Sequence, residues 1–425
     1  MKDLSVYIHI PFCVRKCFYC DFLSFPVDKD AFVKTCGTAF GCAAQNAMES
    51  YVNLLLAEIE KSAVEYKEYQ VLSVFFGGGT PSLLPAKEVG RIIETVRKHY
   101  RIAEDAELTV EMNPDTVTEE KLREYITCGI NRVSIGLQSA DDDELERIGR
   151  IHDYRTFERA YELARKLGFG NINIDLMAAL PEQSVASYER TLKRVTDLAP
   201  EHISAYSLTL EEGTHLYQLR NKFRFPTEEE DREMYAMTGE YLASRGYHRY
   251  EISNYAQDGF ECRHNKVYWQ RGNYVGFGLG ASSMVGNIRW TNPADAEQYR
   301  NYVENIGEDA NAAGGYGADG QSAIGGYGLN GQSAAGHIVD GHILTLHEQM
   351  EEYMFLGLRM MCGVGVQKFA DEFGKRIETV YGDTVTKLYQ QGLLVQEQGR
   401  IRLTERGIDV SNYVMAQFLF DEMER

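Results

Sequence analysis

The sequence predicts an α/β protein: a partial barrel of six βα repeats, followed by a mainly helical, winged-helix-like C-terminal domain. Three observations lead to this fold. Short apolar runs alternate with helical periodicity over residues 1–245, which is the pattern of βα units around a parallel sheet. The two further units that a closed eight-fold barrel needs are not recognisable before residue 270. From residue 341 the chain instead predicts three helices and a hairpin.

The composition describes an ordinary globular chain. Its 425 residues, 44% hydrophobic and 25% charged, are enough for a large barrel and a second domain. The formal net charge of −19 argues against a nucleic-acid binder and against attachment to an anionic membrane surface. Lys2 and Asp3 lead directly into the first apolar run, and no run approaches a membrane span in length. We therefore expect a cytoplasmic protein whose cysteines stay reduced.

The six predicted strands are short apolar runs that end at glycine, proline or polar residues. They cover residues 4–10, 71–76, 108–112, 132–137, 171–177 and 202–208. Helices with one apolar face are predicted at 51–61, 86–99, from 118, from 141, and at 154–167, 184–198 and 228–245. Residues 31–50, which include Cys36 and Cys42 and lack clear periodicity, are interpreted as a loop insertion.

The chain beyond residue 245 changes character. Residues 246–306 are aromatic, polar and then glycine-rich, and we expect them to cover the barrel. Residues 307–340 contain two copies of an eleven-residue repeat, at 314–324 and 325–335, whose glycine content predicts a flexible loop. Residues 341–425 form the C-terminal domain, with helices at about 349–361, 366–373 and 377–391, a hairpin at 393–403 and a final helix.

Three cysteines follow the first strand with the spacing C-x₃-C-x₂-C, at Cys13, Cys17 and Cys20. A zinc site needs a fourth ligand and usually pairs its cysteines as C-x₂-C. Three cysteines suit a [4Fe–4S] cluster better, because three irons are bound and the fourth stays open for another molecule. The alternatives are a structural zinc knuckle or unrelated surface thiols. We predict these three residues as the metal ligands.

Glycines and polar residues lie at or near the carboxyl ends of successive predicted strands, where βα barrels gather their chemistry. They are Gly78, Gly79, Thr80, Glu111, Gln138 and Asp175. The glycines permit close approach to the backbone, and the carboxylates can accept hydrogen bonds from ribose hydroxyls or a cationic ligand. Arg150 offers a bidentate fork to a carboxylate. Taken singly, Asp175 could be a helix-start carboxylate and Arg150 a surface ion pair.

With an aromatic residue before its last cysteine, the loop resembles that of the radical S-adenosylmethionine (SAM) superfamily. Four motifs resemble the oxygen-independent coproporphyrinogen III oxidase family within it: YIHIPFC at 7–13, FGGGTP at 76–81, EMNP at 111–114 and IGLQS at 135–139. The likeness runs over nearly the whole chain. It implies that the cysteines hold a [4Fe–4S] cluster whose open iron binds SAM. It also implies a SAM site lined by Tyr7, Tyr19, Gly78, Gly79, Thr80, Glu111, Gln138, Arg150, Asp175 and Thr209.

Two departures separate this chain from the oxidases of that family. The oxidases have a fourth cysteine two residues after the third, where this chain has Phe22, and an extension ahead of the first strand. Residues 264–269 read His-Asn-Lys-Val-Tyr-Trp, which resembles the H-N-x-x-Y-W motif of the heme chaperone branch, HemW. Members of that branch bind heme and pass it to target proteins.

This resemblance implies that His264 is the heme ligand, since a neutral imidazole is a common axial ligand to heme iron. Tyr268 and Trp269 would pack on the macrocycle. A structural role for His264, or ligation by Cys262, are the alternatives. We predict a heme chaperone on a radical SAM scaffold, without coproporphyrinogen oxidase activity. Its partners would be heme and heme-accepting target proteins, membrane-bound ones included. An active oxidase is the first alternative function and a radical SAM methyltransferase the second.

Overall fold

A curved sheet organises the fold. The computed structural model describes residues 1–27, 44–306 and 339–420. Within them the sheet has twelve strands in the order β14-β13-β12-β11-β1-β4-β5-β6-β7-β8-β10-β9. The strands from β11 to β8 in this order are mutually parallel. The outermost strands β14 and β9 do not pair with each other, so the sheet stays open and the predicted partial barrel is confirmed.

The six predicted strands form the middle of this sheet. They are β1 (Lys2–Ile10), β4 (Tyr69–Gly78), β5 (Arg101–Met112), β6 (Arg132–Gln138), β7 (Ile172–Ala178) and β8 (His202–Ser207). Most of their residues are buried, as expected for parallel strands covered on both faces. β5 begins at Arg101 rather than at residue 108, because its first half carries charged residues and gives no apolar signal.

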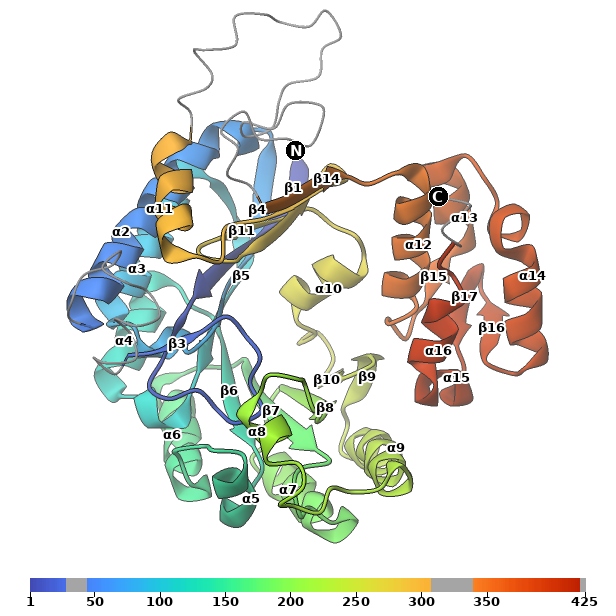
Figure 1. Cartoon of the computed structure of the whole chain (residues 1–425), viewed down its shortest axis with the longest axis horizontal. Helices are drawn as coiled ribbons and strands as arrows, with labels where there is room; N and C mark the ends of the chain where they lie inside the picture. Colours follow the sequence, from blue (N-terminus) through green and yellow to red (C-terminus); the bar gives the residue numbers. More distant parts are fainter. Residues whose placement is uncertain (28–43, 307–338, 421–425) are drawn as a thin grey trace, which may run out of the picture.

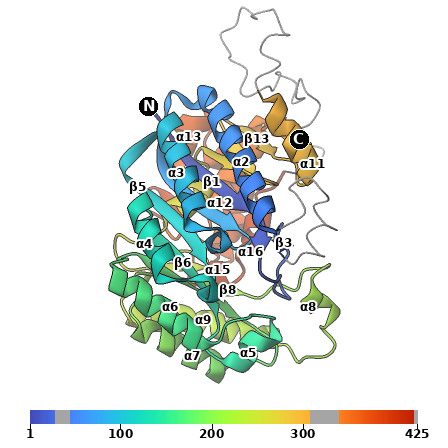
Figure 2. The same ribbon diagram turned by 90° about the vertical axis from the view of Figure 1, so that its left-hand side faces the viewer.

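Helices cover the outer face of the sheet, as Figures 1 and 2 show. They are α2 (Ala44–Ser62), α3 (Ala86–His99), α4 (Glu119–Cys128), α5 (Asp142–Arg147), α6 (Tyr154–Leu167), α7 (Val185–Asp197) and α9 (Glu228–Ser244). α2 begins inside the predicted loop insertion, of which residues 31–43 lie outside the described chain. The loop prediction is wrong for residues 44–50, because Ala47 and Met48 pack into the core and continue the apolar face of the helix.

Residues 246–306 extend the sheet at both edges. They form β9 (His248–Glu251), β10 (Asn254–Ala256), α10 (Arg263–Trp269), β11 (Tyr274–Phe277), β12 (Ser282–Val285), β13 (Ile288–Thr291) and α11 (Ala296–Asn305). β11 adds a seventh parallel strand beside β1, which the glycine-rich sequence does not predict. A Cβ on Gly276 of β11 would stand 2.4 Å from the Ser282 carbonyl oxygen. The missing side chain therefore lets the next strand turn back closely.

The C-terminal residues pack around a second hydrophobic core. This part contains α12 (Leu346–Gly357), β15 (Val364–Gly365), α13 (Val366–Phe373), α14 (Ile377–Gln390), β16 (Leu394–Glu397), β17 (Arg400–Leu403), α15 (Glu405–Asp409) and α16 (Ser411–Ala416). Helices around a small sheet confirm the winged-helix-like prediction, although two short helices replace the single final one. The strand β14 (Val339–Ile343) pairs with β13. Residues 307–338 of the predicted loop lie outside the described chain, and the domain boundaries at 245, 306 and 340 stay predictions.

None of the helices in the described ranges is both long enough and apolar enough to cross a membrane.

Candidate functional site

The three cysteines of the predicted cluster lie together at the carboxyl end of β1. Cys13 is buried in β2 (Phe12–Cys13), and Cys17 and Cys20 are half-buried in the loop that follows. Burial raises the pKa of the Cys20 thiol to about 11, and charge on Cys17 and Cys13 acts in the same direction. Among the described residues, no three His, Cys, Asp or Glu side chains are close enough together to bind one shared metal ion. Three neighbouring thiols of this kind fit a cluster, in which each sulfur binds a different iron.

Hydrogen bonds hold the cysteine loop against the turn at residues 148–149 and against the short helix α8. Phe18 N donates to Ile148 O (3.0 Å), and Leu216 N, in α8 (His215–Gln218), donates to Phe18 O (2.7 Å). Arg15 Nη2 donates to Gly149 O (2.9 Å). Gly149 has a φ of +76°, and a Cβ there would stand 2.7 Å from the Phe18 ring, so only glycine fits. The position of the thiols is therefore set from both sides of the loop.

Gly78 ends β4 beside this loop, and Gly79 follows it. Gly78 has a φ of +109°, and a Cβ on it would stand 2.5 Å from the His9 ring. A Cβ on Gly79 would stand 2.7 Å from the Phe12 carbonyl oxygen. The Gly79 and Thr80 amides donate to the carbonyls of β1 and β2 at 2.8 and 2.7 Å. These glycines thus allow the strand ends to pack closely, while their predicted contact with SAM stays a prediction.

A chain of side-chain hydrogen bonds joins two of the cysteines. Thr80 Oγ1 donates to Cys13 Sγ (3.6 Å), and Asn113 Nδ2 donates to Thr80 Oγ1 (3.0 Å). Arg150 Nη2 donates to Asn113 Oδ1 (2.8 Å), and Arg150 Nη1 donates to Cys17 Sγ (3.5 Å). Donors aimed at the sulfurs favour the thiolate form that an iron–sulfur cluster needs. Asn113 is a site residue that the sequence prediction missed, although it directly follows Glu111-Met112 in a recognised motif.

Tyr19 and Gln138, two further predicted residues, lie near Arg150. The Arg150 Nε atom is buried and has no hydrogen-bond partner among the described residues. The Tyr19 side chain lies beside Arg150, which lowers the pKa of the tyrosine, while burial and charge on Cys17 raise it more strongly. Gln138 ends β6 with a φ of +74°, a strained conformation for a glutamine. Thr209 is exposed in the loop after β8, and no hydrogen bond in the described residues joins it to this group. The unpaired Nε of the Arg150 guanidinium is suited to bind a carboxylate ligand.

Two carboxyl groups lie close together inside the barrel. Burial and the charge of Asp175 raise the pKa of Glu111 to about 8. Asp175 accepts hydrogen bonds from Asn173 Nδ2 (2.7 Å) and Ser134 Oγ (3.0 Å), and burial raises its pKa also. Both side chains are half-buried rather than sealed in the core. Such a pair offers a ligand both a protonated donor and acceptor oxygens.

Sequence reasoning missed two further residues near this pair. Arg132 is 2% exposed, and its charge lies close to Glu107, Cys262 and Asp175. The only sequence signal was an arginine at the first position of an otherwise apolar strand. Tyr206 is 41% exposed on β8 and lies near Asp175. Arg132 and Tyr206 therefore add polar groups beside Asp175 on the inner face of the curved sheet.

His264 lies in the barrel interior, with its side chain engaged on all sides. The residue is 1% exposed, and its ring stacks on Phe75 at 4.9 Å between centroids. Nδ1 is 2.9 Å from Ser73 Oγ, and Nε2 is 2.8 Å from the Tyr268 hydroxyl. Burial lowers the pKa of His264 to about 3, so the imidazole is neutral. The Tyr7 ring, predicted to line the SAM site, is 6.4 Å away. In this conformation neither ring nitrogen is free to bind iron.

The start of α10 is held by a buried carboxylate. Glu107 Oε2 accepts from Arg263 N (3.0 Å), and Glu107 Oε1 accepts from His264 N (3.1 Å) and Cys262 Sγ (3.5 Å). A carboxylate at a helix N-terminus satisfies free amides and suits the helix dipole. Burial raises the pKa of the Cys262 thiol to about 12. The thiol is 0% exposed, so a heme iron cannot reach it without rearrangement.

The other end of α10, at Trp269, contacts the C-terminal domain, which lies to the right of this helix in Figure 1. Arg359 lies over the Trp269 ring, 4.2 Å from its centroid, in place of the predicted macrocycle. Arg271 lies two residues after the end of α10, and its side chain is 4% exposed.

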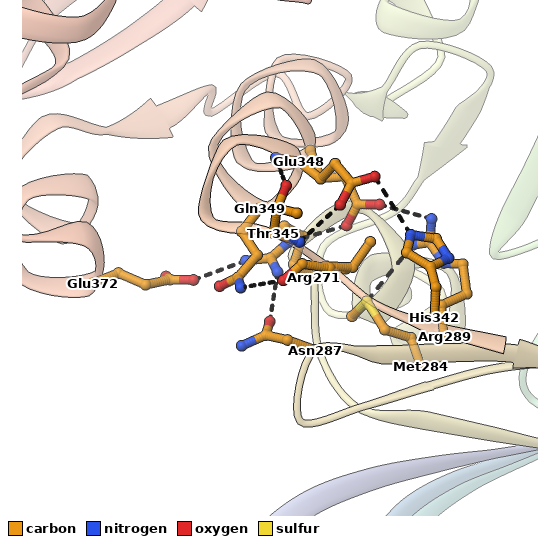
Figure 3. A network of polar contacts seen from close by, with 11 residues as sticks. Arg271, Met284, Asn287, Arg289, His342, Thr345, Glu348, Gln349 and Glu372 are labelled. Atoms are coloured by element: carbon orange, nitrogen blue, oxygen red, sulfur yellow. Dashed lines mark hydrogen bonds and ion pairs between the residues drawn. The ribbon is translucent and has the colours of Figure 1, made fainter. Parts of the chain in front are cut away.

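Figure 3 shows the polar network around Arg271. Its three guanidinium nitrogens donate to Glu352 (3.2 Å), Glu372 (2.8 Å) and Asn287 (2.7 Å). Arg289 pairs with the other oxygen of Glu352 at 2.7 Å. Both carboxylates belong to the C-terminal domain, whereas the arginines and Asn287 belong to the barrel side. The network therefore joins the two hydrophobic cores.

Comparisons with known proteins agree with this architecture. The chain matches the model of the radical SAM superfamily over residues 7–195 and that of the HemN C-terminal domain over residues 344–410. Membership of the superfamily implies a [4Fe–4S] cluster and SAM. The structure of Escherichia coli coproporphyrinogen III oxidase (HemN), described as a radical SAM enzyme, superposes with a TM-score of 0.77. The likeness covers 98% of this chain and 90% of that one at 20% identity, and shows the shared fold.

Sequence relatives define the family more narrowly. The chain is 32% identical to the heme chaperone HemW of Bacillus subtilis, over 98% of this chain and 99% of the relative. It is 37% identical to the heme chaperone HemW of Escherichia coli, over 67% of this chain and 71% of the relative. It is also 30% identical to a mitochondrial radical S-adenosyl methionine domain-containing protein 1 of Bos taurus, over 98% and 87% respectively. This chain therefore belongs to the HemW heme chaperone family of radical SAM proteins.

Proposed function

We propose that this chain binds heme and delivers it to heme-accepting target proteins. The observation that carries the proposal is the match to the Bacillus subtilis heme chaperone, which covers 98% of the chain and both hydrophobic cores. The open sheet supports it, because an unclosed barrel leaves room for a large planar ligand.

The cluster and SAM site belong to the same proposal. Cys13, Cys17 and Cys20 would hold the [4Fe–4S] cluster, which when reduced supplies an electron to SAM. The hydrogen bonds that reach Cys13 from Thr80 and Cys17 from Arg150 support this assignment. The unpaired Arg150 Nε would receive the SAM carboxylate. Tyr7, Tyr19, Gly78, Gly79, Gln138 and Thr209, with the Glu111 and Asp175 carboxyls, would line the remainder of the SAM site.

His264 is the proposed heme ligand. It is neutral, which an iron-binding imidazole must be, and it lies beside Tyr7 of the proposed SAM site. Since both ring nitrogens are hydrogen-bonded in this structure, ligation requires that one partner leaves.

The test uses the full chain with its cluster reconstituted anaerobically. Hemin is titrated and followed by its Soret absorbance, and transfer to an apo-protein acceptor is then measured in the same buffer. We expect stoichiometric binding and transfer, with binding weakened at least about tenfold in His264→Ala, because an axial ligand is lost. His202→Ala is the matched control, since His202 is equally buried with both nitrogens bonded.

Formation of protoporphyrinogen from coproporphyrinogen in that sample would contradict the chaperone assignment and favour the oxidase. Unchanged hemin binding in His264→Ala would remove the ligand assignment and leave the chaperone function standing.

A further inference from the structure

The hydrogen-bond network around His264 assigns the position of its ring proton. Ser73 donates its single hydroxyl hydrogen to Ser5 Oγ at 2.7 Å. The Ser73 oxygen therefore faces His264 Nδ1 as an acceptor at 2.9 Å, and Nδ1 must carry the hydrogen. Nε2 then holds the free lone pair and accepts from the Tyr268 hydroxyl at 2.8 Å.

This is the arrangement of a histidine prepared to bind a metal. In metal sites the ligating nitrogen has a lone pair, and the other nitrogen donates its hydrogen to a second group that orients the ring. Here Ser73 on β4 is that group, and Ser5 on β1 fixes it in turn. Phe75 stacks on the ring face, and Glu107 binds the backbone amide of His264. The ring is therefore held with Nε2 directed at Tyr268.

Tyr268 differs from the other groups around the imidazole. It lies one helical turn after His264 on α10 and is half-buried, whereas Ser5, Ser73 and Glu107 are buried on sheet strands. Its ring packs in a T-shaped arrangement with Tyr274, with 4.7 Å between the ring centroids. Of the two partners of the imidazole, Tyr268 is thus the one that can move without disturbing the sheet.

We propose that Tyr268 blocks the iron-binding nitrogen of His264 in the heme-free protein, and that an iron porphyrin with an open axial position replaces its hydroxyl. The inference rests on the proposed function. On binding, the O–H···Nε2 hydrogen bond breaks and an Fe–Nε2 bond forms. The hydroxyl keeps its proton and no electron is transferred. Heme affinity is therefore reduced by the free energy of one buried hydrogen bond.

The experiment compares hemin binding to the wild type and to Tyr268→Phe, using the cluster-reconstituted full chain. We expect Tyr268→Phe to bind hemin about three- to tenfold more tightly, because no hydrogen bond must be broken. Its Soret maximum and low-temperature electron paramagnetic resonance spectrum should match those of the wild type, because the ligand is unchanged. Tyr250→Phe is the matched control: the Tyr250 hydroxyl also bonds a buried histidine, 2.9 Å from His202 Nε2, and its loss should leave hemin affinity unchanged.

Each other outcome is decisive. Equal affinity in the wild type and Tyr268→Phe overturns the inference, as does an equal gain in Tyr250→Phe. If His264→Ala binds hemin with the wild-type spectrum, the inference fails while heme binding stands. If the wild type binds no hemin, the proposed function itself fails. Melting temperatures of the two Tyr→Phe variants check that their cores are intact.

Discussion

The carboxyl group of Glu111 occupies a site that favours its protonated form. Burial and Asp175 raise its pKa from 4.5 to about 8. The folded state therefore binds this proton more tightly than the unfolded state, and the stabilisation is complete below pH 4.5 and lost as the pH rises towards 8. A single residue thus makes the stability of the whole protein depend on pH.

Replacing this residue tests that dependence. We expect the stability of the wild type to fall by on the order of 1 kcal/mol per pH unit between pH 5 and 8. This fall should be absent in Glu111→Gln, because an amide does not titrate. Urea unfolding of the SAM-free protein at pH 5, 7 and 9 measures the difference, with the exposed Glu120→Gln as control. Parallel pH profiles for Glu111→Gln and the wild type would contradict the raised pKa.

The sequence predicts single residues well where their spacing is local. The C-x₃-C-x₂-C run lies within eight residues, and its thiols do gather in the structure. The link between Thr80 and Arg150 through Asn113 depends on the ends of β4 and β5 meeting the loop after α5, which no local pattern contains. The same holds for His264, whose partner Ser73 is almost two hundred positions away in the sequence.

Among the elements, α10 is the one whose position matters most for the site. It has only seven residues, too few for a stable helix in isolation, so its anchors decide its position. Glu107 accepts from the amides of its first turn at one end, and Arg271 binds the C-terminal domain at the other.

We expect Glu107→Gln to loosen this helix, because an amide nitrogen replaces one of the two acceptor oxygens and faces a backbone donor. Amide hydrogen exchange in residues 263–269 should become about five- to twentyfold faster, as one or two hydrogen bonds are lost. Glu261→Gln is the control: it also lies beside α10, but it pairs with the side chains of Lys266 and His248. Equal protection in the two variants would show that Glu107 does not anchor α10.

Long periodic elements were predictable, whereas short ones were not. α3 and α6 match their predicted bounds, because each carries a regular apolar face over fourteen residues. The strands β9 to β13 have three or four residues each and contain glycines or polar residues. Their formation depends on pairing with a sheet that already exists, and this tertiary information is absent from a short window of sequence.

At the scale of the whole molecule, two hydrophobic cores are joined by a buried ionic network. Arg271 and Glu352 both have side chains that are only 4–6% exposed. Removing Arg271 leaves Glu352 with Arg289 alone and takes this cation from Glu372. Breaking a buried ion pair in this way costs about 3–5 kcal/mol. The barrel and the C-terminal domain should therefore be coupled in unfolding, and Arg271 should carry much of the coupling.

We expect Arg271→Met to lower stability by about 3 kcal/mol and to separate the unfolding of the two cores, because Glu352 and Glu372 lose their shared cation. Calorimetry and urea unfolding followed by two probes measure this. Arg402→Met is the control, since it breaks an exposed pair with Glu397 and should change stability by less than about 1 kcal/mol. A single transition of unchanged midpoint in Arg271→Met would show that the network does not couple the cores.

The closeness of Tyr7 to His264 has a consequence for how the protein handles two ligands. The Tyr7 ring lies 6.4 Å from the imidazole and bonds His9 beside the cysteine loop at 3.1 Å. Tyr7 therefore lines both the proposed SAM site and the proposed heme site, and a movement of Tyr7 changes both. By thermodynamic reciprocity, whatever factor SAM imposes on heme affinity, heme imposes on SAM affinity. Heme binding and SAM binding are then thermodynamically coupled, so measuring the effect of either ligand on the other gives the same coupling free energy.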